Sequence, residues 1–294
     1  MQSGLAQRAG HLLEPITKLL FRLPGAAGSA ILMSLIGGYP VGARMTVQLL
    51  DAALITQKQA QRMLFFCVNS GPAFLISAVG SAMLRSRQAG LILCAALTAS
   101  ALLIGLCMRF LASKETMRES PVVPPTGPSM AQALVDAATQ GCAGIVSICV
   151  WVILFSCIAA LFSLLPLPST LRILLQCFLE VTSGCASAAG KVPLPALALV
   201  LGWGGICVHC QVLHDVSKTK LSLPLFFCGR VANGLLACLI SAGLFRLFPC
   251  ETPVFLTMCR RYRRPSPPLR RWPPECLFMC ALLILEVEGR RKTC

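Results

Sequence analysis

The chain has 294 residues, of which 56% are hydrophobic and only 13% are charged. Soluble domains carry about 25% charged residues, so this composition excludes an ordinary soluble domain and indicates a lipid bilayer around about six to eight apolar segments. The net charge of +15 is typical of nucleic-acid binding, but much of it lies in an arginine-rich tail, so we expect no nucleic-acid partner.

The first expected element is an amphipathic helix over residues 11–23. Glu14, Lys18 and Arg22 follow one another at intervals of four residues, which places their charges on one face of a helix. Pro15 is typical of the first turn of a helix. We therefore expect Glu14 to lie near a helix N-terminus at the membrane interface.

The apolar stretch over residues 24–54 is interrupted near its middle by the sequence GGYPVG. Glycine lowers helix propensity and proline lacks an amide hydrogen, so the helix is predicted to open around Tyr39 and Pro40. Unpaired backbone groups are costly in hydrocarbon, so such a break persists only where it is buried in protein or lines a polar cavity. We assign four residues of this break to substrate binding: Gly37, Gly38, Tyr39 and Pro40.

A second interruption, Asn-Ser-Gly-Pro at residues 69–72, lies between two apolar runs. Asn69 and Ser70 offer an amide and a hydroxyl beside a Gly-Pro pair that frees backbone groups. The alternative is a surface loop between two helices. Because apolar residues flank the segment closely, we assign Asn69 and Ser70 to the substrate site.

The remaining elements divide the chain into parts. Residues 89–112 predict an uninterrupted span, long enough for about 30 Å of hydrocarbon, and residues 131–165 predict one long helix. A charged, proline-rich linker lies between them. We expect a first repeat with its following transmembrane helix at 1–112, the linker at 113–129, a second repeat at 130–255 and a tail at 256–294.

The second half repeats an order found in the first: a glutamate, a Gly-Gly pair and an asparagine at closely similar spacings. These are Glu14, Gly37, Gly38 and Asn69 in the first half, and Glu180, Gly204, Gly205 and Asn233 in the second. Internal repeats with broken helices at corresponding places are typical of secondary transporters, whose substrate sites lie at the breaks.

The second repeat supplies the other candidate site residues. We assign Gly204, Gly205, Gln211 and Asn233 to substrate binding. Glu180 follows an apolar run, and a carboxylate inside a membrane is a functional hypothesis by default, so we assign ion coupling to Glu180. The alternative for Glu180 is a side chain that anchors a helix end at the membrane interface.

Other chemistry has little support in the sequence. The 17 cysteines are scattered through apolar runs, where cysteine acts as a small packing residue. Cys207, His209, Cys210 and His214 match no common zinc spacing. The chain also lacks the common hydrolase and metalloprotease motifs. We expect no metal, no cofactor and no enzymatic activity.

Several segments carry a family resemblance: LLEPITKLLFRLPGAAGSA, GGYPVGARM, LLDAALITQKQAQRMLFFCVNSGPAFLISAVG, LEVTSGC and WGGICVHCQVL. They resemble the nucleoside-recognition (Gate) domain membrane proteins, in particular a sporulation protein of that group. The resemblance covers residues 12–254. It implies an all-α, polytopic membrane helix bundle with two gate-like repeats that contain broken or re-entrant helices, similar to concentrative nucleoside transporters.

The resemblance also implies a function. We expect a transporter of a small polar or anionic metabolite, dipicolinate, in the cell membrane or outer forespore membrane of a spore-forming bacterium. Half-helix N-termini at the breaks suit such a carboxylate. The alternatives are a structural or partner-binding membrane protein without transport and a nucleoside transporter-like protein. The sequence leaves open whether the chain forms a homo-oligomer.

Both ends of the chain depart from the family pattern. Members carry hydrophobic sequence before the Leu-Leu-Glu-Pro element, so we expect this chain to begin late. After Val254 the sequence becomes CRRYRRPSPPLRRWPPECLFMC, which is typical of a translated shifted reading frame. The alternative for the arginine run is a patch that binds anionic lipid.

Overall fold

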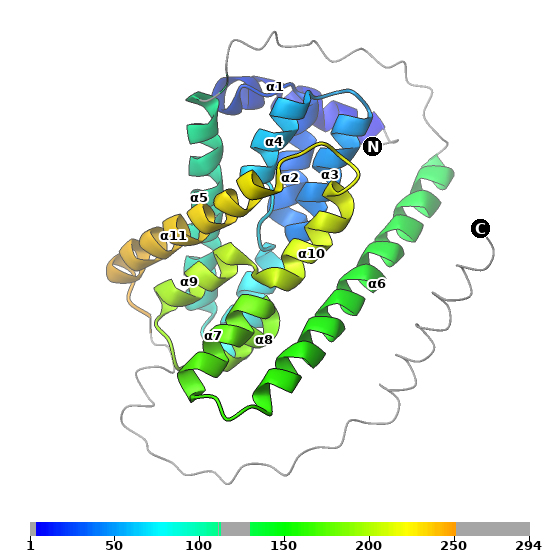
Figure 1. Cartoon of the computed structure of the whole chain (residues 1–294). Coiled ribbons are helices and arrows are strands. Elements are labelled where there is room, and N and C mark those ends of the chain that lie inside the picture. Colours follow the sequence, from blue (N-terminus) through cyan, green and yellow to red (C-terminus); the bar gives the residue numbers. More distant parts are fainter. Residues whose placement is uncertain (1–3, 111, 113–129, 251–294) are drawn as a thin grey trace, which may run out of the picture. The chain divides into compact units, whose positions relative to one another are not determined.

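A computed structural model describes residues 4–110, 112 and 130–250 of the chain (Figure 1). These residues form helices and no strand, which confirms the all-α expectation. In chain order the helices are α1 (Gly4–Phe21), α2 (Ala26–Gly37), α3 (Tyr39–Asp51), α4 (Gln57–Phe66), the π-helical η1 (Phe74–Met83), α5 (Arg87–Phe110), α6 (Met130–Ser163), α7 (Ser169–Leu179), α8 (Val181–Ala188), α9 (Leu194–Trp203), α10 (Gly205–Val216) and α11 (Leu223–Leu247).

Four segments of the described chain are long and apolar enough to cross a membrane: α5, α6, the α9–α10 pair and α11. The helices α1 and α2 meet at 85° and together would form a fifth, bent span. Two further apolar helices, η1 and α7, are shorter. At 1.5 Å per residue, helices of this length cannot cross about 30 Å of hydrocarbon alone. The predicted long helices over 89–112 and 131–165 are confirmed as α5 and α6.

The start of α1 differs from the expectation. The helix begins at Gly4 and continues through Pro15, so Glu14 lies inside the helix and not near its N-terminus. Proline removes one backbone donor from a helix, and α1 continues past this loss as far as Phe21. The carboxylate of Glu14 pairs with Lys18 one turn later, with 2.5 Å between oxygen and nitrogen.

Helices from the two halves of the chain pack against one another. The helix α11 lies against α4 and α5 of the first half as well as against α9, and α10 lies against α3. The contact of α9 with α11 is made by bare backbone, since a Cβ on Gly202 would lie 2.4 Å from the Cα of Gly234. These close contacts position the elements on which the candidate site residues lie.

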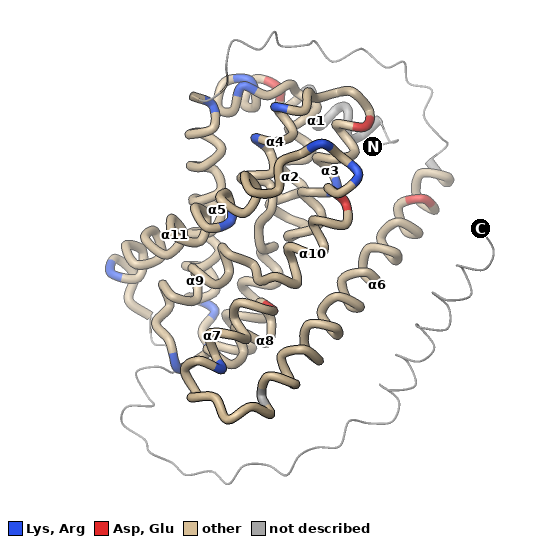
Figure 2. The backbone as a smooth tube through the Cα atoms, in the orientation of Figure 1, with Lys and Arg blue, Asp and Glu red and all other residues tan. Residues whose placement is uncertain are grey.

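The long helix α6 contacts α7 and α10 and is otherwise largely exposed. Its exposed residues are mainly apolar, as at Ile145, Val150 and Leu154, which suits a surface that faces lipid. Figure 2 shows that most charged residues of the described helices lie near helix ends. The distribution is the one expected of helices that cross hydrocarbon.

Candidate functional site

Four of the interruptions between consecutive helices of the described chain bear on the candidate site. They separate α2 from α3 at Gly38, α4 from η1 at residues 67–71, α7 from α8 at Glu180, and α9 from α10 at Gly204. Three of them were predicted from Gly-Gly or Gly-Pro pairs. The third, which was not predicted, shows that Glu180 itself lies between two helices.

The first break falls at Gly38, one residue before the predicted opening at Tyr39 and Pro40. Gly38 has φ of 90°, a conformation that costs glycine little because it has no Cβ. The helix α3 resumes at Tyr39 and holds Pro40 in its first turn. A missing amide hydrogen has no cost in a first turn, so Pro40 helps to restart the helix and does not open it.

The first two breaks touch through their backbones. A Cβ on Gly38 would lie 3.5 Å from the amide nitrogen of Gly71, and a Cβ on Gly71 would lie 3.0 Å from the carbonyl oxygen of Ile36. Two glycines therefore allow the break between α2 and α3 to lie directly beside the break between α4 and η1.

The Gly-Gly pair of the second half forms the fourth break and lies against the first and the third. Gly204 and Gly205 have φ of 88° and 79°, which explains the choice of glycine at both positions. A Cβ on Gly204 would lie 3.2 Å from Cε1 of Tyr39, and a Cβ on Gly205 would lie 3.3 Å from the Cα of Glu180. The structure thus brings the breaks of both halves together around this pair.

The hydroxyl of Tyr39 joins the two halves. It donates to the carbonyl oxygen of Leu201, near the end of α9, at 2.5 Å. The hydroxyl of Ser70 in turn donates to the Tyr39 oxygen. Both side chains are buried, so this short chain of hydrogen bonds connects the first, second and fourth breaks.

The two asparagines of the repeat meet, although their surroundings differ. Asn69 lies in the second break, whereas Asn233 lies inside the unbroken helix α11. The Asn233 amide donates to the Asn69 side-chain oxygen and to the Gly202 carbonyl, each at the long distance of 3.5 Å. Its own oxygen accepts from Ser100 of α5 at 2.7 Å.

The carboxylate of Glu180 is buried, with 1% of the residue exposed. Its two oxygens accept from the amides of Thr182 at 2.8 Å and Ser183 at 2.6 Å. These are the free first-turn amides of α8, and an acidic N-cap stabilises both the amides and the helix dipole. Glu180 is therefore placed by the start of α8 rather than by an exposed helix end.

Two predicted site residues lie less centrally. Gln211 is buried on α10, and its amide lies 3.5 Å from the sulfur of Cys207 one turn earlier. Among the described residues this contact stays within α10 and does not link Gln211 to Tyr39 or to Glu180. Gly37 is exposed at the end of α2.

Among the four residues whose spacing matches no zinc site, His209 has a defined hydrogen-bond partner. His209 Nε2 lies 2.9 Å from the carbonyl oxygen of Trp203, and its ring packs edge-on against the indole of Trp203 with centroids 4.3 Å apart. Within the described residues, no three His, Cys, Asp or Glu side chains gather as metal ligands.

Arg230 was not predicted as a site residue from the sequence. This residue of α11 is fully buried, and its guanidinium donates to the carbonyl oxygens of Val68 and of Phe65, the latter at 3.3 Å. Both carbonyls belong to the second break or to the last turn before it. A charged residue within the apolar sequence of α11, three residues before Asn233, was the available signal, because intramembrane charges are rarely incidental.

Side chains form hydrogen bonds with the carbonyl groups that the breaks expose. The carbonyls of this kind are those of Phe65, Phe66, Val68, Leu201, Gly202 and Trp203. By contrast, α3 and α10 begin at glycine caps that offer no side-chain hydrogen bond. At the meeting of the breaks, acceptors are therefore paired, while two helix N-termini are left without a side-chain cap.

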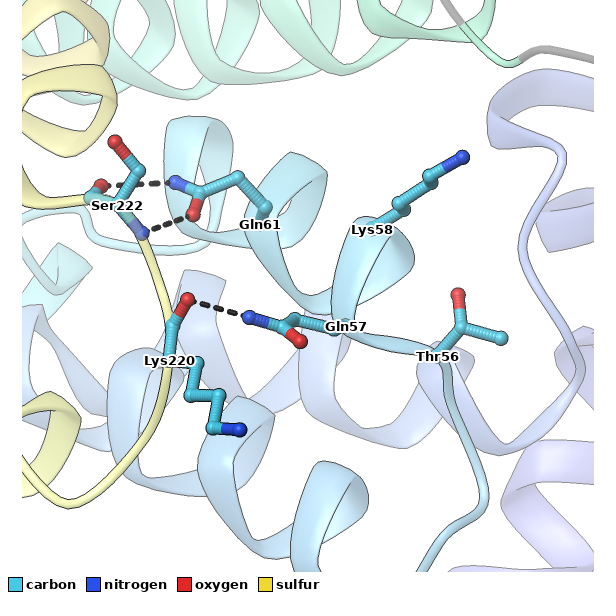
Figure 3. A pocket seen from close by; sticks show the side chains of 6 residues that line it. All are labelled: Thr56, Gln57, Lys58, Gln61, Lys220 and Ser222. Atoms are coloured by element: carbon cyan, nitrogen blue, oxygen red, sulfur yellow. Dashed lines mark hydrogen bonds between the residues drawn. The ribbon is translucent and has the colours of Figure 1, made fainter.

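A separate pocket lies at the other end of α4 (Figure 3). It has a volume of about 640 Å³ and is lined by Thr56, Gln57, Lys58, Gln61, Lys220 and Ser222. The amide of Gln61 forms two hydrogen bonds with the backbone of Ser222, and Gln57 donates to the carbonyl of Lys220. This pocket includes none of the predicted site residues.

Comparison with known proteins supports the membrane assignment. The chain is similar to the sporulation integral membrane protein YlbJ of Bacillus subtilis (strain 168), with 26% identity over 278 residues, which cover 80% of this chain and 67% of that protein. Together with the apolar spans described above, this similarity decides the cellular location. The chain is a multi-pass integral membrane protein. No protein-family model matches it, and no solved structure does.

Proposed function

We propose that the chain is a transporter that carries a small carboxylate-bearing metabolite through the place where the helix breaks meet. One observation carries this proposal: the breaks leave the N-termini of α3 and α10 without a side-chain cap, while their exposed carbonyls are paired. Helix N-termini carry partial positive charge, so such a place favours an anion.

The origin of the breaks supports transport over a static anion site. They come from both halves of the chain and meet through Tyr39, Ser70 and Leu201. In secondary transporters built from repeats, the substrate binds between the repeats, and movement of one repeat against the other exposes it to either side. We propose that the two halves are gate-like repeats of this kind.

We propose dipicolinate, a pyridine dicarboxylate, as the substrate, and sporulation as the setting. The name of the relative places that protein in sporulation, and the family resemblance of residues 12–254 implies this substrate. The expected location is the cell membrane or the outer forespore membrane. Glu180 is proposed as the group that couples uptake to a cation or proton, because its carboxylate is buried beside the Gly204–Gly205 break.

The test is uptake of labelled dipicolinate by vesicles that contain the purified full chain. We expect saturable uptake that unlabelled dipicolinate inhibits and uridine does not. A structural or partner-binding membrane protein would give uptake no greater than that of protein-free vesicles. Inhibition by uridine with no effect of dipicolinate would indicate the nucleoside transporter-like alternative.

A further inference from the structure

We infer that Arg230 is the residue that selects a substrate with two carboxylates over one with fewer negative charges. This inference rests on the proposed function, and it adds a specificity-determining residue to the same site. Of the Arg, Lys, Asp and Glu residues that the structure describes, three are buried: Arg62, Glu180 and Arg230. Arg230 is the cation among them that bonds to the break between α4 and η1.

The guanidinium of Arg230 retains donors for a ligand. An arginine has five N–H donors in a planar fork. Two nitrogens, Nη1 and Nη2, bond to the carbonyls of Val68 and Phe65, whereas Nε is buried and has no acceptor among the described residues. A buried donor without an acceptor is costly, and a carboxylate can bind Nε and a neighbouring Nη together.

Pairing of carbonyls alone does not explain a cation at this place. The carbonyl of Phe66, in the same break, is satisfied by the neutral amide of Asn69. A charged side chain within a membrane is expensive by comparison. The positive charge of Arg230 therefore calls for a purpose beyond holding the break, and an anionic substrate supplies one.

The position of Arg230 places this charge among the candidate site residues. Val68, which accepts from Arg230, immediately precedes Asn69 and Ser70. Asn233 follows Arg230 by three residues on α11, so the two side chains share a face of that helix. A carboxylate at the free side of the guanidinium would lie next to the asparagine pair.

The test measures charge selectivity in vesicles that contain the full chain. The two substrates are pyridine-2,6-dicarboxylate and its monoamide, which has nearly the same shape and one negative charge fewer. The quantity measured is the ratio of their kcat/KM values, which does not depend on the amount of protein inserted. We expect the wild type to prefer the dicarboxylate and Arg230→Gln to lower the ratio by about tenfold or more, as for loss of a hydrogen bond between charged groups.

Arg62→Gln is the matched control. Arg62 also bonds to two carbonyls at a helix break, those of Phe21 and Arg22 at the bend between α1 and α2, but this bend is not one of the four breaks that meet around Tyr39 and the Gly204–Gly205 pair. We expect its selectivity ratio to equal that of the wild type. An equal fall of the ratio in both variants would overturn the inference.

Other outcomes separate the inference from the proposed function. Saturable uptake by Arg230→Gln with the wild-type ratio overturns the role of Arg230 and leaves transport intact, whereas no saturable uptake by the wild type overturns both. If Arg230→Gln does not insert, Arg230→Lys decides, because an ammonium keeps the charge but lacks the planar fork. We expect Arg230→Lys to prefer the dicarboxylate with a raised KM, and an unchanged KM would overturn the inference.

Discussion

The two halves of the chain share an order of residues but use it differently. In the first half, Glu14 lies on a helix surface and pairs with Lys18, and its side chain is 32% exposed. In the second half, Glu180 is buried and caps α8. Asn69 lies in a break, whereas its counterpart Asn233 lies in an intact helix of 25 residues.

This difference shows a division of roles between the asparagine-bearing elements. The break between α4 and η1 exposes carbonyls, and α11 stays intact and supplies the donors Arg230 and Asn233 that meet this break. Proline explains part of the difference. Pro72 disfavours helix at the residue before it, whereas Gly234 of α11 serves as a contact point for Gly202.

The largest effect on transport is expected from substitution of Glu180, which differs from its counterpart Glu14 more than any other pair between the halves. Glu180→Gln retains an oxygen that can accept from the α8 amides, so the protein should insert. It removes the charge proposed to couple uptake, so driven uptake should fall to background while exchange of solute persists. Uptake driven by an ion gradient in vesicles measures this.

Glu14→Gln is the control for the same measurement. It weakens a partly exposed pair with Lys18, which is worth about 0.5 kcal/mol, and its driven uptake should be unchanged. Driven uptake by Glu180→Gln at the parental rate would remove Glu180 from the mechanism and shift attention to Gln211 and to the Asn69–Ser70 break.

A large loss of stability is expected when α3 is pushed away from the second break. A Cβ on Gly42 would lie 1.6 Å from the carbonyl oxygen of Cys67, and backbone cannot yield cheaply there. Gly42→Ala should lower the free energy of unfolding by about 3 kcal/mol or more. Gly243→Ala of α11 has open space around the new methyl and should be neutral or stabilising by up to about 1 kcal/mol.

Thermal unfolding in detergent, followed by the fraction of protein that stays monodisperse, compares these two glycine variants. Equal midpoints for Gly42→Ala and Gly243→Ala would show that α3 does not lie directly against the second break.

A moderate effect is expected at the asparagine pair. Asn233→Ala removes the partner of Ser100 and of Asn69 and should cost about 1–3 kcal/mol. Asn69→Ala should cost less, because its main bond is local, to the carbonyl of Phe66. If the two side chains interact as described, the double variant should show a coupling of at least about 0.5 kcal/mol. Simple additivity in a double-mutant cycle would argue against the contact between the break and α11.

The smallest effect is expected at the hydroxyl that links the halves. Tyr39→Phe leaves the Leu201 carbonyl without its donor and Ser70 without its acceptor, and should cost about 1 kcal/mol. Ser70→Ala preserves the bond from Tyr39 to Leu201 and should cost less. If Ser70→Ala is the more harmful of the two in thermal unfolding, the bond to Leu201 is not what holds the halves together.

Local sequence signals predicted much of this arrangement. Gly-Gly and Gly-Pro pairs mark the breaks because their effect on the backbone is local, and α5 and α6 follow from the length of their apolar runs. The spacing repeat pointed to Asn69 and Asn233, which do meet. Their roles as substrate ligands remain predictions.

Other features depend on contacts that no local pattern contains. The carbonyl of Val68 lies 162 residues from its donor Arg230, so the purpose of that buried charge appears only after folding. The start of α1 was misjudged because Pro15 is tolerated inside the helix. The linker at 113–129 and the tail after Leu256 lie outside the described residues, and the predictions for them stay predictions.

Uptake of labelled dipicolinate by variants of the glycine breaks tests whether the substrate passes where the breaks meet. Gly38→Leu and Gly205→Leu place a side chain at φ of 90° and 79°, which favours closing the breaks or strains them, while Gly243→Leu adds the same side chain in open space. We expect that all three insert, that Gly243→Leu transports as the wild type does, and that both break variants lose saturable uptake. Wild-type uptake by Gly38→Leu and Gly205→Leu at matched protein level would contradict a transport site at the meeting of the breaks.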